Sequence, residues 1–131
     1  MIFDTSVWIA FFRNVRNEQT DLLDLYLQTG DLYMLGVLVQ EILQGIRHDN
    51  QYEEISSILT SLPFLNQSTL YFHVAAAQLY RQLRKKGITI RKPNDCLIAT
   101  YAVYFDLELC HNDTDFDLIA EHTALKIWTP S

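Results

Sequence analysis

Residues 107–120, with the sequence LELCHNDTDFDLIA, place a short apolar segment, an acidic turn and the beginning of a helix in succession. Residues 107–111 predict a β-strand, and residues 115–122 predict a short helix. Three carboxylates fall within five residues of this junction, at Asp113, Asp115 and Asp117. Charges this close repel one another unless water, a cation or a helix N-terminus compensates them. The junction therefore raises the question of what the acids bind.

The rest of the chain alternates between predicted strands and predicted helices. Apolar runs predict further strands at residues 1–3, 32–35 and 126–129. A helix follows the first strand, with Thr5 or Ser6 as its cap, and carries Trp8 to Phe12. Apolar residues at helical spacing predict the other helices, at residues 18–28, 37–46, 52–62, 68–86 and 93–105. Strands separated by helices predict an α/β domain, a three-layer α/β/α sandwich with a short, mostly parallel central sheet.

Composition predicts one globular domain that spans residues 1–131. Hydrophobic residues make up 49% of the chain and charged residues 20%, which excludes disordered and fibrous classes. Cys96 and Cys110 lie inside apolar stretches and form no CxxC pair, so we expect buried free thiols in a reducing compartment. We find neither a leader-like segment nor an apolar run of about 20 residues, so we expect a soluble cytoplasmic protein without membrane contact.

The basic residues are concentrated in one segment. The net charge is −6, which alone argues against a polyanionic partner. Six of the ten Lys and Arg residues nevertheless fall between residues 81 and 92, at Arg81, Arg84, Lys85, Lys86, Arg91 and Lys92. The end of a helix before Gly87 accounts for Arg84, Lys85 and Lys86 through the helix dipole, but not for Arg91 and Lys92. Both a solvated helix end and an anion-binding segment remain open.

Four acidic residues occupy positions from which they can form one site. Asp4 and Asp113 each follow a predicted strand, and ligand sites in parallel sheets form at the carboxyl ends of strands. Asp95 falls in the first turn of a helix opened by Pro93, where the dipole alone would favour it. Glu41 lies in an apolar helix, where it either faces solvent or requires a partner or cation. Together these acids predict a site for one or two Mg²⁺ or Mn²⁺ ions.

A calcium loop does not explain the alternating acids of residues 113–117. An EF-hand loop needs a glycine where this chain has Leu118, and a bidentate glutamate where it has Ala124. The acids therefore belong to another kind of site.

Four motifs in fixed order resemble the PIN domain family, and more narrowly the VapC-type toxins of bacterial and archaeal type II toxin–antitoxin modules. The motifs are DTSVWI (residues 4–9), GVLVQEILQGI (36–46), GITIRKPNDCLIATYA (87–102) and ELCHNDTDFDLIA (108–120). Each motif alone is weak, but together they cover nearly the whole chain. The resemblance places the family's acidic cluster on Asp4, Glu41, Asp95 and Asp113, with Asp115 as a further acid near the metal.

The resemblance implies a Mg²⁺- or Mn²⁺-dependent endoribonuclease that uses a metal-activated water. Asp4, Asp95 and Asp113 would be the ligands, while Glu41 would be a ligand or would position the attacking water. The auxiliary residues would be Thr5, Ser6 and Asn112. We interpret His111 as an ordinary hydrogen-bonded residue at a strand end, and Asp117 as an acid that serves its helix. The basic segment would hold the RNA backbone through Arg84, Lys85, Arg91 and Lys92.

The resemblance also implies partners. Members of the family form homodimers and are inhibited by a cognate antitoxin, whose C-terminal arm wraps the toxin. Trp8, Phe11 and Phe12 would either line the groove for that arm or pack in the core, which is usual for aromatic residues at helical spacing.

Two other classes of protein remain as alternatives. A phosphatase of the haloacid dehalogenase type also begins with an apolar strand and an Asp nucleophile. It usually has a second Asp two residues later, where this chain has Ser6, and it is usually longer. The second alternative is a catalytically silent binding module, in which the same acids hold a structural ion.

Overall fold

A short parallel sheet lies at the centre of the computed structural model, which describes residues 1–65 and 69–131. Its strands in these residues are β1 (Ile2–Phe3), β2 (Glu108–Cys110) and β3 (Lys126–Ile127), in the order β1-β2-β3. Both pairs are parallel, and Leu109 lies opposite Ile2 on one side and Ile127 on the other. The parallel sheet predicted from the apolar runs is confirmed.

The predicted strand at residues 32–35 does not form. Two isolated parallel bridges replace it, one from Ile2 to Tyr33 and one from Met34 to Phe64. The chain enters a helix at Gly36, which leaves too few extended residues for a longer ladder. The bridges still continue the parallel arrangement beyond β1, on the side away from β2. The chain therefore changes direction across the sheet between β1 and β2, where open α/β sheets bind their ligands.

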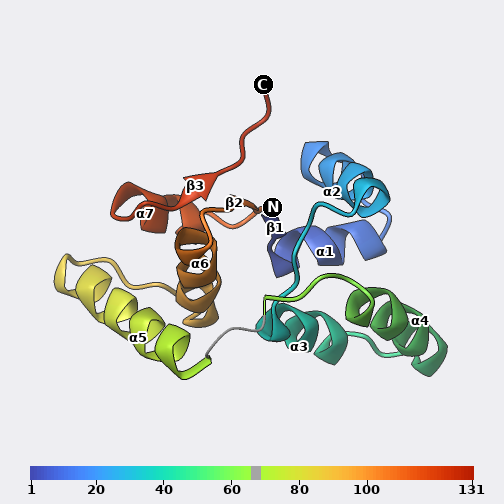
Figure 1. Ribbon diagram of the computed structural model, residues 1–131, viewed down its shortest axis with the longest axis horizontal. Helices are drawn as coiled ribbons and strands as arrows, with labels where there is room; N and C mark the ends of the chain where they lie inside the picture. The colour runs from blue at the N-terminus through green and yellow to red at the C-terminus, as the bar shows by residue number, and fades with distance from the viewer. Residues whose placement is uncertain (66–68) are drawn as a thin grey trace.

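Helices flank the strands on two sides (Figure 1). One group contains α1 (Thr5–Phe12), α2 (Glu18–Thr29), α3 (Gly36–Gln44) and α4 (Asp49–Thr60). The other group contains α5 (Thr69–Lys85), α6 (Asn94–Tyr104) and α7 (Asp115–Glu121). Helices α1 and α2 pack together, as do α5 and α6. This arrangement confirms the predicted α/β fold.

Some helix ends differ from the predictions. Asp4, and neither Thr5 nor Ser6, is the N-cap of α1, because the helix begins directly after β1 and Asp4 retains an extended backbone. Helix α4 begins at Asp49, three residues earlier than predicted, and ends before Pro63 as expected. Ser68, proposed as the first residue of the longest helix, lies outside the described residues.

Aromatic residues form much of the core. Trp8 is fully buried and stacks on Phe12 with ring centroids 5.8 Å apart, while Phe11 and Phe12 are partly buried. Core packing is thus the correct interpretation of Trp8. Cys96 and Cys110 are buried free thiols, as predicted. Burial raises the pKa of Cys96 to about 11 and that of Cys110 to about 12, so both thiols stay protonated at neutral pH.

The helices of the described residues are all too short or too polar to span a lipid bilayer.

Candidate metal centre

The acids converge at the carboxyl ends of β1 and β2. Asp4 directly follows β1, and its backbone N–H donates to the carbonyl oxygen of Cys110, the last residue of β2. Asp113 lies in the turn after β2, and Asp95 lies in the first turn of α6. The parallel sheet thus brings together residues from the two ends of the chain.

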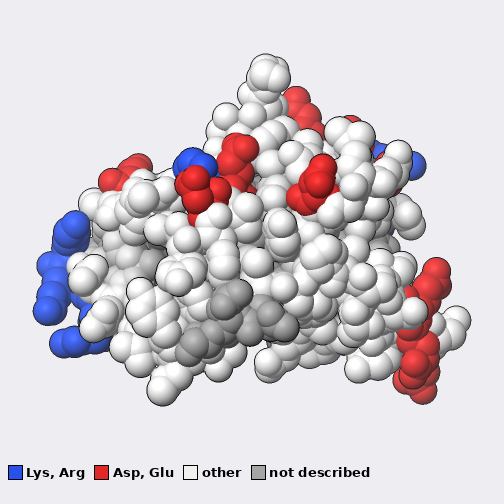
Figure 2. Space-filling view, in the orientation of Figure 1, with Lys and Arg blue, Asp and Glu red and all other residues white. Residues whose placement is uncertain are grey.

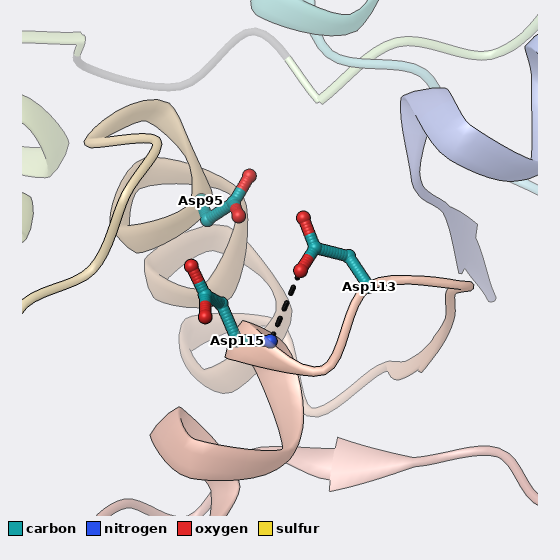
Figure 3. A group of neighbouring side chains, drawn as sticks. All are labelled: Asp95, Asp113 and Asp115. Atoms are coloured by element: carbon teal, nitrogen blue, oxygen red, sulfur yellow. Dashed lines mark hydrogen bonds between the residues drawn. The ribbon is translucent and has the colours of Figure 1, made fainter.

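Three carboxylates at this edge of the sheet form a tight cluster. Ligand oxygens of Asp95, Asp113 and Asp115 all lie within 4.8 Å of one another. The three side chains, from α6, the turn after β2 and the beginning of α7, point toward a common space (Figure 3). Their residues are buried, with exposed fractions of 2%, 7% and 6%. The backbone N–H of Asp115 donates to Asp113 Oδ1 at 3.0 Å and ties two members together.

Asp95 has a strongly raised pKa. Burial raises its pKa most, and the negative charges of Asp4 and Asp113, and to a lesser extent Glu41, raise it further, to about 8, while the positive charge of Lys92 opposes them. Its Oδ2 atom is buried and has no hydrogen-bond partner among residues 1–65 and 69–131. A buried carboxylate oxygen of this kind is costly unless a cation or a proton compensates it.

Arg91 and Lys92 compensate the other two members of the cluster. The Arg91 guanidinium contacts Asp113 Oδ1 at 3.3 Å and Asp115 Oδ2 at 3.4 Å, and its backbone N–H donates to Asp115 Oδ2. The Lys92 ammonium lies 3.5 Å from Asp113 Oδ2. Burial acts to raise the pKa of Asp113, but the Asp115 N–H and these two cations outweigh it, so the pKa lies below its ordinary value.

Asp4 is held by a hydrogen-bond relay. The backbone N–H and the hydroxyl of Ser6 both donate to Asp4 Oδ2, at 3.1 and 2.7 Å. The Ser6 hydroxyl in turn accepts a hydrogen bond from the backbone N–H of Asn112. Ser6 and Asn112, predicted as auxiliary residues, thus link the turn after β2 to the beginning of α1.

Glu41 lies beside the cluster and not within it. It is half-buried on α3, and its Oε1 atom accepts a hydrogen bond of 2.7 Å from the Thr5 hydroxyl. Its negative charge contributes to the raised pKa of Asp95, so it acts on the same site. Thr5 therefore supplies the hydrogen-bond partner that the Glu41 carboxylate needs when it faces inward.

His111 and Asp117 brace the turn that carries Asp113. His111 Nδ1 accepts a hydrogen bond from the backbone N–H of Asp113 at 2.9 Å, which leaves the ring proton on Nε2. Nε2 lies 3.0 Å from Asp117 Oδ1. Asp117 also lies in the first turn of α7, where its charge suits the helix dipole. Both residues have the structural roles that the sequence suggested.

The predicted RNA-binding residues fall into two groups. Arg91 and Lys92 lie at the cluster, with exposed side-chain fractions of 69% and 61%. Arg84 and Lys85 lie in the last turn of α5. Figure 2 shows basic side chains gathered at the left end of this face, where Figure 1 places the end of α5, away from the acidic groups.

A sequence model of the PIN domain matches residues 1–122. The chain belongs to the PIN domain family. It is similar to the VapC ribonuclease Mb1587 of Mycobacterium bovis and to ribonuclease VapC11 of Mycobacterium tuberculosis. Each is 35% identical to it over 130 residues, which cover 96% of both chains. The resemblance read from the four motifs is confirmed.

Solved structures share the fold of this PIN domain. A VapBC2 complex from Rickettsia felis, solved with a promoter DNA fragment, aligns with a TM-score of 0.73 at 20% identity, covering 98% of this chain and 100% of that one. A DNA-bound VapBC complex from Salmonella typhimurium aligns with a TM-score of 0.76 at 19% identity, covering 97% and 95%. At these identities the likeness establishes the fold alone.

The acidic cluster of this PIN domain fits a hard divalent cation. Its donor set consists of carboxylate oxygens, which Mg²⁺ and Mn²⁺ prefer, and Asp95 Oδ2 is a buried oxygen without a partner in the described residues. The sequence predicts Asp115 only as a further acid near the site, whereas in the structure it forms the tight cluster with Asp95 and Asp113. Its alternation with Asp113 was the available signal, but the same spacing also suits a turn that opens a helix.

We predict that Asp95→Asn stabilises the metal-free protein in a pH-dependent way. The pKa of Asp95 is raised on folding, so ionisation favours the unfolded state, and the penalty grows as the pH rises from about 4 toward 8. The stability gain of the variant over the wild type should grow across this range and then level off. Urea unfolding in the presence of chelator measures it, with Glu121→Gln as an exposed control. A gain that stays constant with pH would contradict the assignment.

Proposed function

We propose that this PIN domain is a metal-dependent endoribonuclease and the toxin of a toxin–antitoxin pair. The main support for the proposal is the buried acidic cluster at the carboxyl ends of β1 and β2, in which Asp95 Oδ2 has no hydrogen-bond partner among the described residues. The names of its curated relatives, which are ribonucleases, support the same reaction. Cleavage of an RNA phosphodiester bond requires charge compensation at a phosphate, and a cation in this cluster meets that requirement.

The residues of the cluster divide between holding a cation and fixing its surroundings. Asp95, Asp113 and Asp115 would hold a Mg²⁺ or Mn²⁺ ion, with Asp4 as a further ligand, direct or through water. When bound, the ion supplies Lewis-acid chemistry, activating water and stabilising charge on the phosphate. Ser6 orients the Asp4 carboxylate, and His111 fixes the backbone of Asp113. Glu41, oriented by Thr5, would bind the ion or accept a proton from the attacking water.

Exposed cations beside the cluster would hold the RNA backbone. Arg91 and Lys92 contact the acids in the metal-free protein through partly exposed side chains, so a cation in the cluster would free them for phosphate. Arg84 and Lys85 would extend this contact at the end of α5. We place the protein in the cytoplasm, which suits both an RNA substrate and its free thiols.

An antitoxin and a second copy of the chain are the proposed protein partners. VapBC complexes among the solved structures support an antitoxin. Because Trp8 is buried in the core, the antitoxin arm would use Phe12 instead. Phe12 lines a cavity of about 450 Å³ between α1, α3 and α4, together with Ile42 and Ile55.

The two alternative classes have less support. Membership of the PIN family favours a nuclease over a phosphatase of the haloacid dehalogenase type. The Ser6 hydroxyl donates to Asp4 at the position where that phosphatase has its second Asp. A silent binding module would keep the acids but would not cut RNA. Trapping of an aspartyl phosphate would identify the phosphatase.

Amide substitution in the cluster should abolish RNA cleavage. Asp4→Asn, Asp95→Asn and Asp113→Asn each remove a negative charge from the proposed cation site, so the rate should fall about a hundredfold or more. Gel assays on total RNA with Mg²⁺, with and without chelator, measure the loss. Glu121→Gln, an exposed acid at the end of α7, should cut like the wild type, and all variants should remain folded by circular dichroism. A folded Asp4→Asn variant that cuts normally would overturn the proposal.

Charge reversal at Arg84, Lys85, Arg91 and Lys92 should weaken RNA binding and flatten its salt dependence. Each lost phosphate contact lowers the slope of log affinity against log salt by about 0.7 for single strands. Reversal of Arg84 and Lys85 alone should raise KM without altering the dependence on Mg²⁺, because these two residues lie away from the cluster. Steady-state cleavage at several salt concentrations measures both effects. Unchanged cleavage and unchanged salt dependence in the fourfold variant would refute this role.

A further inference from the structure

Two basic side chains cover the acidic cluster on its solvent side. The side chains of Arg91 and Lys92 are 69% and 61% exposed, whereas those of Asp113 and Asp115, which they contact, are 6% and 8% exposed. The positive charges therefore lie nearer to solvent than the carboxylates do. A metal ion that arrives from solvent meets two cations before it reaches these acids.

Both carboxylate oxygens of Asp113 already contact a cation. Its Oδ1 atom lies 3.3 Å from Arg91 Nη2 and also accepts the backbone N–H of Asp115 at 3.0 Å. Its Oδ2 atom lies 3.5 Å from Lys92 Nζ. Because a carboxylate oxygen has about two acceptor sites, an ion that binds Asp113 must displace one of these contacts or share an oxygen with a positive charge.

Arg91 contacts Asp115 through its backbone and through its side chain. The backbone N–H donates to Asp115 Oδ2 at 3.1 Å, and Nε lies 3.4 Å from the same oxygen. The backbone contact ties the loop before α6 to the beginning of α7, so this loop stays anchored when the guanidinium moves away. The side-chain contacts are long and partly exposed, and ion pairs of this kind are weak enough to exchange.

Asp95 differs from the other two members of the cluster. Its Oδ2 atom is buried and has no hydrogen-bond partner among residues 1–65 and 69–131, and it makes no ion pair within them. A carboxylate oxygen of Asp95 nevertheless lies within 4.8 Å of oxygens of Asp113 and Asp115. An ion held by Asp95 would thus reach the other two acids on the side where Arg91 and Lys92 contact them.

We propose that Arg91 and Lys92 are built-in competitors of the metal ion, and that a divalent cation binds by replacing their side-chain contacts with Asp113 and Asp115. These two residues then set how tightly the ion binds, although neither is a ligand. The proposal rests on the nuclease function proposed above and adds the residues that control metal occupancy.

Calorimetric titration of Mn²⁺ measures the effect on affinity. Arg91→Gln and Lys92→Gln each remove a positive charge beside the ion, so each variant should bind Mn²⁺ about tenfold more tightly than the wild type, and the double variant more tightly still. Arg91→Lys keeps the charge and should stay close to the wild-type affinity. Arg16→Gln, at an exposed position between α1 and α2, is the matched control and should not change it. Equal or weaker binding by the double variant would overturn the proposal.

Nitrogen-15 NMR of the wild type tests the exchange without relying on the stability of a variant. Titration with Mg²⁺ should move the side-chain Nε–H signal of Arg91 toward the position of the exposed Arg16 signal, because the guanidinium leaves Asp115 as the ion binds. The conservative variant Arg91→Lys assigns the signal by its loss, and the Arg16 signal should not move. An Arg91 signal that stays in place while the backbone signal of Asp95 reports saturation with Mg²⁺ would refute the exchange.

The outcomes separate this proposal from the nuclease function. If the wild type binds Mn²⁺ and cuts RNA but the double variant binds no more tightly, the competition fails while the nuclease function stands. If the wild type binds Mn²⁺ and cuts no RNA, the nuclease function fails, and the measured affinities still decide the competition. If neither the wild type nor the double variant binds Mn²⁺, the cluster is not a cation site and both proposals are wrong.

Discussion

Electrostatic repulsion among buried carboxylates at the carboxyl ends of β1 and β2 governs the arrangement of this protein. Asp4, Asp95, Asp113 and Asp115 are all buried, and ionised carboxylates in such surroundings are costly without compensating charge. The parallel sheet concentrates these negative charges, because it brings the turn after β1 and the turn after β2 to the same edge. Most other features of the site can be understood as responses to this concentration of charge.

The protein compensates each acid in a different way. Asp4 receives hydrogen bonds from Ser6, Asp113 receives an amide hydrogen and two cations, and Asp115 receives the backbone and side chain of Arg91. Asp95 is left with a raised pKa and an oxygen that has no partner in the described residues. Leaving one acid unsatisfied costs stability, and such costs are typical of functional sites. A divalent cation would compensate the whole cluster at once.

Sequence alone could predict that acids from distant parts of the chain converge at one edge of the sheet, but not which of them lie closest together or how they are held. Apolar runs predict the strands at residues 1–3 and 107–111, and a parallel pairing of these strands brings the turns that carry Asp4 and Asp113 to the same edge of the sheet. The prediction of a strand at residues 32–35 is wrong. Whether a short apolar run forms a strand depends on the strands that it can pair with and on the elements next to it, and here a helix begins at Gly36. The contacts of Arg91 with Asp113 and Asp115 depend on the path of the loop before α6, which local patterns do not encode.

Calorimetric titration of Mn²⁺ into the metal-free protein tests the central claim most directly. If the buried carboxylates form a cation site, the wild type should bind Mn²⁺ with measurable heat, and Asp113→Asn should lose this binding while remaining folded. Glu121→Gln should bind like the wild type. Absence of binding in the wild type, or equal binding in the folded Asp113→Asn variant, would contradict the claim that these carboxylates are arranged around a metal ion.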